Sequence, residues 1–170
     1  MDPGYIKAFI SSIQNVFATM FQLPVTVGTP YIKGDPSPQY DVSGIIGMSG
    51  DVFGSVVLSF PTETAESVVA LFTGTQLEIG TPDFADAIGE LVNMVSGGAK
   101  ANFKDRRVQI SCPSVVIGEG HRLARQSDIP CIVIPCTTDC GDLSLEIAIR
   151  ENAPAEGTAA SARTSSTRTA

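Results

Sequence analysis

Residues 81–103 carry the sequence pattern that most restricts how this chain can fold. Apolar side chains recur there at intervals of three and four residues, at Phe84, Ile88, Leu91, Val92 and Val95. This spacing predicts a long amphipathic helix with one buried face. Thr81 is a favourable N-cap residue, and Pro82 suits the first helical position, where its missing N–H costs nothing. The chain must therefore bury one side of this helix against other elements.

The open side of the same helix carries three polar residues. Asp86, Glu90 and Asn93 are separated by four and then three positions, so their side chains share one face. The Asn93 carboxamide combines an acceptor with a donor and can orient a water molecule without titrating. The Glu90 carboxylate can pair with a lysine of a partner protein. A solvated helix face explains the same pattern more simply, and the pattern alone does not separate the two explanations.

Two adjacent glycines, Gly97 and Gly98, also lie inside the predicted helix. Each costs about 0.8–1 kcal/mol there relative to alanine. Glycines tolerated at such positions often mark the close approach of another backbone. We expect them to reflect tight packing of this helix on a neighbouring element rather than contact with a ligand.

The remainder of the chain predicts further helices and a mostly antiparallel sheet. Residues 5–22 have helical apolar spacing, and a shorter helix begins at Pro61 and ends at Gly74. Runs rich in β-branched residues predict strands at 25–33, 42–49, 52–60, 108–112 with a continuation at 115–117, 131–138 and 143–150. Short turns join the second to the third strand and the last two strands, so each pair is an antiparallel hairpin. The result is a mixed α+β fold, with two long helices packed on the sheet and two halves of one helix and about three strands each.

Residues 1–150 are predicted to form one domain, and residues 151–170 a disordered tail. A chain of 170 residues suits a single domain with a substantial core. The last twenty residues contain no aromatic or aliphatic β-branched residue. Such a segment cannot bury enough surface to offset the entropy lost on ordering.

Composition argues against several classes of partner. The net charge is −7, which disfavours nucleic acid as the main partner. No segment approaches the ~18 apolar residues of a membrane span, and the first residues lack the pattern of a signal peptide, so we expect a cytoplasmic protein without membrane contact. A basic group follows the key helix, and we expect it to interact with the helix C-terminus; its members are Lys100, Lys104, Arg106 and Arg107.

The cysteines and the single histidine do not indicate a metal site. No standard zinc spacing relates His121 to the four thiols, which are Cys112, Cys131, Cys136 and Cys140. Buried or half-buried thiols on strands are the ordinary alternative. We expect His121 to be solvated in a loop, with no nucleophile in a recognisable motif near it.

The polar helix resembles a known family. Asp86-x3-Glu90-x2-Asn93, within the string AIGELVNMVSGGAK, is similar to the signature helix of the CheC/CheX chemotaxis phosphatases. The opening helix, YIKAFISSIQNVFATM, resembles that of the CheX branch, including Phe17, Thr19 and Met20. The resemblance covers residues 3–150 in the order of elements and is specific in these two helices.

The resemblance implies an aspartyl-phosphate phosphatase with a CheC/CheX-like fold. Its substrate would be a phosphorylated CheY-like response regulator, whose receiver domain supplies the Mg2+ and a lysine. Asn93 would hold the attacking water and Glu90 would dock by pairing with that lysine. Asp86 matches the leading position of the motif and would support the helix or the docking. The resemblance also implies a homodimer, and it implies no cofactor or metal of the chain's own.

Two departures from the family pattern bear on these expectations. Pro113 follows Asn93 after nineteen intervening residues, where the family has a proline some twenty-odd residues on, so the strand register after the helix is in doubt. Relatives of the CheC type carry a second Glu-x2-Asn in the first helix. This chain has Ser11, Ser12 and Asn15 there but no glutamate, which predicts one site per chain.

Two other functions compete with the phosphatase. A non-catalytic adaptor could use the same helix to sequester a phosphorylated regulator. The intact pair of Glu90 and Asn93 favours the enzyme, since a pure binder would not need the carboxamide. An enzyme based on the thiols and His121 would require bound zinc, which metal analysis of the purified protein would reveal.

Overall fold

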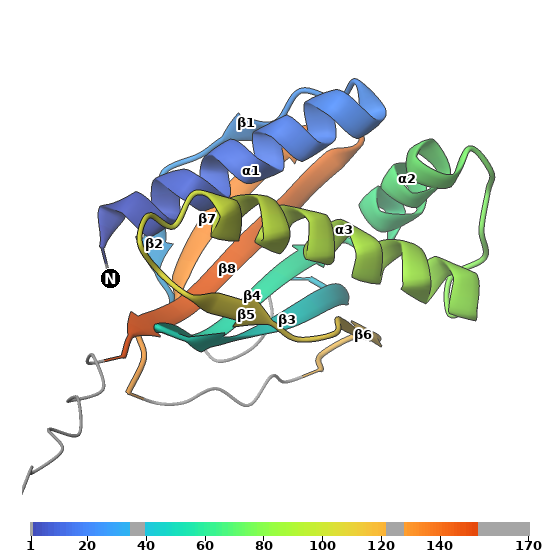
Figure 1. The fold of residues 1–170 in the computed structure, drawn as a ribbon. Coiled ribbons are helices and arrows are strands. Elements are labelled where there is room, and N and C mark those ends of the chain that lie inside the picture. Colours follow the sequence, from blue (N-terminus) through green and yellow to red (C-terminus); the bar gives the residue numbers. More distant parts are fainter. Residues whose placement is uncertain (1, 35–39, 122–127, 153–170) are drawn as a thin grey trace, which may run out of the picture.

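The computed structural model describes residues 2–34, 40–121 and 128–152 (Figure 1). Within these ranges the chain has three helices, which are α1 (Pro3–Phe21), α2 (Thr62–Thr73) and α3 (Pro82–Ala101). It also has eight strands, which are β1 (Thr26–Val27), β2 (Tyr31–Ile32), β3 (Val42–Gly50), β4 (Val52–Phe60), β5 (Val108–Ile110), β6 (Ser114–Ile117), β7 (Ile132–Thr138) and β8 (Gly141–Glu151). The predicted helices and hairpins are therefore present, and the mixed α+β class is confirmed.

All eight strands form one sheet, and every pairing in it is antiparallel. The strand order is β1-β7-β8-β4-β3-β5, with β2 also on β7 and β6 also on β3. Figure 1 shows the helices on one face of this sheet, with α1 and α3 side by side across the strands. The long strands β4 and β8 are central in this order, and α3 makes its closest approach to the sheet at β3.

The predicted two halves are present, and they exchange their edge strands. Each half consists of a helix, a short broken edge strand and a hairpin, in the orders α1-β1/β2-β3-β4 and α3-β5/β6-β7-β8. The edge strands of the first half pair with β7, and those of the second half pair with β3. Each edge therefore ties one half to the other.

The prediction of one continuous strand at residues 25–33 was wrong. The backbone pairs with β7 through β1 and the Gly28 N–H, which donates to the Pro135 carbonyl at 2.8 Å, and resumes pairing at β2. Pro30 lies in this break and has no N–H to donate, which interrupts the ladder. Pro113 likewise separates β5 from β6, but both strands pair with β3, so the predicted continuation beyond Pro113 is confirmed.

Strand β8 and its contacts continue to residue 152, just beyond position 150. Glu151 is the last residue of β8. The Asn152 N–H donates to the Asp51 carbonyl at 2.9 Å, and its side-chain amide donates to the Gly50 carbonyl at 2.6 Å. The rest of the predicted tail, residues 153–170, lies outside the described residues.

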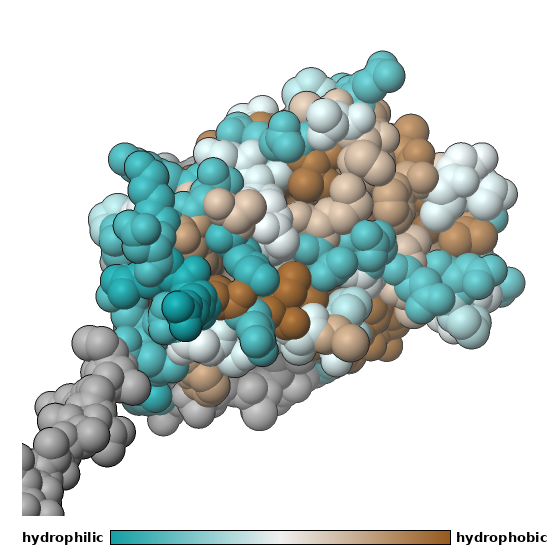
Figure 2. Space-filling view, in the orientation of Figure 1, coloured by the Kyte–Doolittle hydropathy of each residue, from teal (hydrophilic) through white to brown (hydrophobic). Residues whose placement is uncertain are grey.

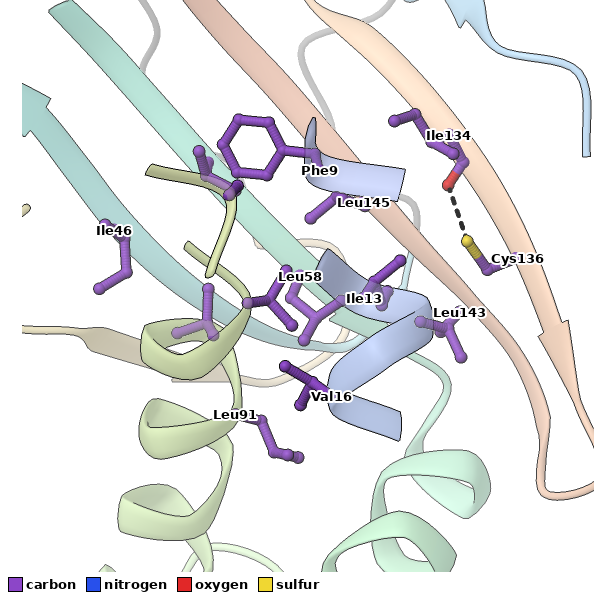
Figure 3. Close-up of a cluster of buried hydrophobic side chains, with 14 of the residues drawn as sticks. Phe9, Ile13, Val16, Ile46, Leu58, Leu91, Ile134, Cys136, Leu143 and Leu145 are labelled. Carbon is purple, nitrogen blue, oxygen red and sulfur yellow. Dashed lines mark hydrogen bonds between the residues drawn. The ribbon is translucent and has the colours of Figure 1, made fainter. Parts of the chain in front are cut away.

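The core lies between the helices and the sheet (Figure 3). Side chains from α1, α3 and the central strands meet there, and Phe9, Ile13, Leu58, Leu91 and Leu145 are fully buried. On the outer surface of the helices, some apolar side chains remain exposed. Figure 2 shows apolar residues near the end of α1 and at α2, where Met20 and Leu71 are 48% and 49% exposed.

The opposite face of the sheet is more polar. The side chain of Glu146 alternates with those of core residues along β8 and forms an ion pair with Lys33 at 2.6 Å, in which both side chains are buried. A small apolar cluster lies on the same face, formed by Ile129, Cys131 and Ala148 with Phe53 packed against it.

The two glycines inside α3 have different environments. A Cβ at Gly98 would lie 2.4 Å from the Ser12 hydroxyl oxygen of α1. That hydroxyl is buried and donates to the Val95 carbonyl at 2.7 Å. A Cβ at Gly97 would have no atom within 4 Å. The predicted tight packing on a neighbouring helix is confirmed for Gly98 and wrong for Gly97.

Gly98→Ala is expected to destabilise the protein, and Gly97→Ala to stabilise it. The added methyl group at position 98 forces the Ser12 hydroxyl away from the Val95 carbonyl, at a cost of about 1–3 kcal/mol of unfolding free energy. At position 97 the higher helix propensity of alanine acts alone and adds about 0.8–1 kcal/mol. Urea denaturation of both variants measures the two changes.

Ser12→Ala provides the control for the clash. It removes the hydroxyl oxygen and leaves the Ser12 Cβ, which lies 3.4 Å from the added methyl position. Gly98→Ala should therefore cost less in the Ser12→Ala background than in the wild type. Equal costs in both backgrounds would show that the close approach of α1 is not the reason for Gly98.

Candidate functional site

The helix that carries the polar edge, α3, begins with a regular N-cap. Thr81 is the N-cap, and its hydroxyl accepts from the Phe84 N–H at 3.4 Å, while Pro82 is the first helical residue. Asp86 and Glu90 are exposed and Asn93 is half-buried. The Asn93 side-chain amide lies 3.5 Å from Glu90 Oε2, at the outer limit of a hydrogen bond. The structure thus brings all three predicted residues onto one open edge, with the hydrogen-bonding capacity of Glu90 and Asn93 largely available.

The buried side of α3 holds this edge firmly in place. The apolar positions predicted from periodicity, Phe84, Ile88, Leu91, Val92 and Val95, are all fully buried. The helix lies close to β3, because a Cβ at Gly44 would be 3.0 Å from Val92 Cγ1. The contact with Ser12 of α1 fixes the C-terminal half of the helix in the same way.

A groove runs along the first half of the polar edge, between α3 and the segment that enters β6. It has a volume of about 420 Å³ and is lined by Ala85, Asp86, Gly89, Glu90, Pro113 and Val115. A Cβ at Gly89 would lie 3.2 Å from Pro113 Cγ, so the proline ring rests directly on the helix backbone. Pro113 and Val115 also line this groove, and the sequence did not identify them as candidate site residues. The proline spacing that departed from the family pattern was the only signal for them.

This geometry suits action on another macromolecule. Asp86, Glu90 and Asn93 stand on the outer side of a helix, and the groove beside them is open to solvent. Such an edge cannot enclose a small substrate, but its side chains can enter a cavity in a second protein. Figure 2 shows hydrophilic residues along this part of the surface, over the N-terminal half of α3.

The environment of His121 differs from the prediction. Its Nδ1 lies 2.8 Å from the Gly118 carbonyl oxygen and its Nε2 lies 3.1 Å from the Ser43 hydroxyl oxygen, so the ring is held rather than solvated. This serine–histidine contact is not a nucleophilic site, because Ser43 is fully buried. Ser43 also lies on the sheet face opposite α3, since its neighbour Gly44 contacts that helix.

The thiols are dispersed. Cys131 and Cys136 are buried, Cys140 is half-buried and Cys112 is exposed. Burial raises the pKa of the Cys136 thiol to about 12. Burial, and secondarily the Asp139 carboxylate, raise the pKa of the Cys140 thiol. In the part of the chain that the structure describes, no group of three or more His, Cys, Asp and Glu side chains could hold a metal ion.

A second hollow, of about 400 Å³, lies where the start of α1 meets the end of α3 and of β8. Three of its lining side chains, those of Tyr5, Arg106 and Glu151, contact one another. The Tyr5 hydroxyl donates to Glu151 Oε1 at 2.6 Å, and Arg106 contacts Glu151 Oε2 at 3.0 Å. Burial and the adjacent Glu151 carboxylate raise the pKa of Tyr5. Of the basic group expected at the helix C-terminus, Lys100 lies in the last turn of α3 as predicted, whereas Arg106 serves this cluster instead.

Comparison with known proteins identifies similar chains. The family described as "Chemotaxis phosphatase CheX" matches residues 42–137. The curated protein "CheY-P phosphatase CheX" of Thermotoga maritima is 30% identical over 121 residues, which are 69% of this chain and 78% of that protein. None of the described helices is both long and apolar enough to cross a membrane.

Solved structures share the fold. A chemotaxis protein CheX from Desulfovibrio desulfuricans has a TM-score of 0.78 and 31% identity, covering 87% of this chain and 99% of that one. The structure described as the CheX-CheY-BeF3-Mg+2 complex from Borrelia burgdorferi has a TM-score of 0.72, at 22% identity, over 86% of this chain and 98% of that one. The likeness to the Borrelia protein concerns the fold alone.

Thiol labelling tests the placement of the cysteines. Because Cys112 is exposed while burial protects the other thiols and raises the pKa of Cys136 and Cys140, we expect one fast-reacting thiol in the native protein at pH 8. A chromogenic disulfide reagent measures this count against four in denaturant. Cys112→Ser should abolish the fast phase. Two or more fast thiols in the native protein would contradict the placement.

Proposed function

The chain belongs to the chemotaxis phosphatase CheX family, and on that premise we propose that it accelerates the dephosphorylation of a phosphorylated CheY-like response regulator. The curated relative from Thermotoga maritima is described as a CheY-P phosphatase. The observation that supports the same activity here is the placement of Asn93 and Glu90. They are one turn apart on the exposed edge of a helix whose other sides are packed against the sheet and α1.

The chemistry requires little from this chain besides position. In the regulator, the phosphorus is bonded to a carboxylate oxygen of an aspartate. A water oxygen attacks that phosphorus, the bond to the aspartate breaks, and inorganic phosphate leaves while the water's proton passes to solvent or phosphate. Holding the water in line with the breaking bond supplies much of the acceleration. The Asn93 carboxamide performs this task, because its carbonyl oxygen accepts from the water and it does not titrate.

Glu90 provides the docking contact. Its carboxylate lies one turn before Asn93 on the same edge and pairs with the lysine of the receiver domain. The contact at 3.5 Å between the two side chains is weak enough for both to turn toward the partner. Asp86 lies one further turn away and lines the groove beside Pro113, where it adds to docking or to the helix start.

Mg2+ enters the reaction with the regulator. The described residues of this chain include no cluster of ligands that could hold the ion, and the chemistry assigned to Asn93 and Glu90 needs none from this side. The Borrelia complex, which shares the fold, is described with BeF3 and Mg2+. Bound in the receiver domain, the ion would neutralise charge on the phosphoryl oxygens.

Membership of the CheX family also suggests the oligomeric state and the cellular location of the protein. We propose a cytoplasmic homodimer, which sedimentation analysis would test as a mass of twice the 17.8 kDa chain. The sheet offers a short edge at β2, where Ile32 is 72% exposed. Edge strands of this kind are commonly covered by pairing.

Asn93→Ala is expected to reduce phosphate release from a phosphorylated CheY-type receiver domain by about a hundredfold or more, with Mg2+ present. Binding to the receiver domain should persist, because Glu90 still docks. Glu90→Ala should weaken binding about 10- to 100-fold, as expected for the loss of a contact between charged groups. Release of inorganic phosphate and binding to the beryllofluoride form of the receiver measure the two effects separately.

Asn15→Ala is the matched control for the Asn93 variant. Asn15 is an exposed helical asparagine on α1, with Ser12 rather than glutamate three residues before it. Its loss should leave the rate unchanged, as expected for one site per chain. Equal rates for wild type and Asn93→Ala would contradict the mechanism. Tight binding without acceleration by the wild type would instead favour the adaptor that sequesters the regulator.

A further inference from the structure

Among the residues that the structure describes, none accounts for a glycine at position 97. It lies inside α3, where glycine is less favourable than alanine, and a Cβ built on it meets no atom within 4 Å. The other close glycines of this region are explained by Ser12, Pro113 and Val92, which their missing side chains would strike. Packing therefore explains why those positions are glycine, whereas no packing contact of the described residues requires glycine at position 97.

The position of Gly97 relates it directly to the candidate site. It lies four residues after Asn93 and seven after Glu90, which places it on the same exposed edge of α3. Gly89 lies four residues before Asn93, on the groove side. Asn93 therefore has a glycine one helical turn away in each direction, and on its C-terminal side the edge continues with Gly97, where a Cβ would meet nothing.

If the Asn93 carboxamide is to enter another domain, that domain needs room on the helix surface next to Asn93. For Asn93 to reach a phosphoryl group inside another domain, the rim of that domain's site must descend onto the helix within one turn of Asn93. Side chains one turn apart are about 5–6 Å from each other, so position 97 lies under that rim. On the other side, Pro113 already covers the position of Gly89. Gly97 is thus the point where an approaching backbone can come closest.

We propose that Gly97 is a positioning residue for the phosphatase reaction: the missing side chain lets the receiver domain contact the α3 backbone and sets the depth to which Asn93 enters. This inference rests on the proposed function and assigns one occupant to the surface, the phosphorylated receiver domain. A methyl group at this point holds the receiver away from the helix and displaces the Asn93 carboxamide from the line of attack. A displacement on the order of 1 Å is enough to cost a large part of the rate.

Gly97→Ala separates this role from a structural one. We expect a loss of at least tenfold in kcat/KM for phosphate release, together with an increase of about 2–4 °C in Tm from the better helix former. The probe is a phosphorylated CheY-type receiver domain whose dephosphorylation the wild type accelerates, with Mg2+ present. Because the variant is more stable, unfolding cannot cause the loss. Gly97→Leu, with a larger side chain, should lose more activity than Gly97→Ala.

Gly34→Ala is the matched control. It adds the same methyl group at a second glycine whose Cβ would meet nothing within 4 Å, in the exposed segment after β2 at the far edge of the sheet from β6, and its activity should be unchanged. Full activity of Gly97→Ala and Gly97→Leu, with Asn93→Ala inactive, would overturn the inference and leave the proposed function intact. A change in self-association with unchanged kcat/KM would also overturn it. A wild type no faster than Asn93→Ala would remove the proposed function itself.

Discussion

The close packing of α3 is the constraint on which the rest of this structure depends. The helix approaches β3 at Gly44, the β6 segment at Gly89 and α1 at Gly98, and at each of these points a Cβ would press on a neighbouring side chain. The contacts come from three different elements, so the helix is held along its length. Its fully buried apolar face adds the hydrophobic contribution that keeps it on the sheet.

A firmly held helix is what the proposed chemistry requires. An amide that positions a water molecule contributes only if its own location is fixed, because a small displacement removes the alignment. The chain accordingly places Asn93 on α3 rather than on a loop. In the proposed reaction the regulator supplies the phosphoryl group and the ion, so the site on α3 needs no pocket that encloses the reaction. The same logic assigns significance to Gly97, which leaves the partner room to approach that edge.

Local sequence patterns were sufficient to predict most helices and strands, but they did not predict which strands pair. The hairpin of β3 and β4, the Thr81 N-cap of α3 and the ends of α2 at Pro61 and Gly74 depend on neighbouring residues, and each agrees with its prediction. The exchange of edge strands between the halves was not predictable, because strand partners lie far apart in the sequence. The contact of His121 with Ser43 joins residues 78 positions apart, and no sequence motif indicated it.

The sequence alone was enough to place Asp86, Glu90 and Asn93 on one edge, because helical periodicity brings positions four and three residues apart onto one face. It also indicated that the glycine pair in α3 was unusual. The packing of the helices then shows that Gly98 accommodates Ser12 of α1, whereas a Cβ at Gly97 would meet no atom within 4 Å. The physical reason is that periodicity fixes the direction of a side chain relative to its own helix. The atoms that occupy that direction belong to elements distant in the chain.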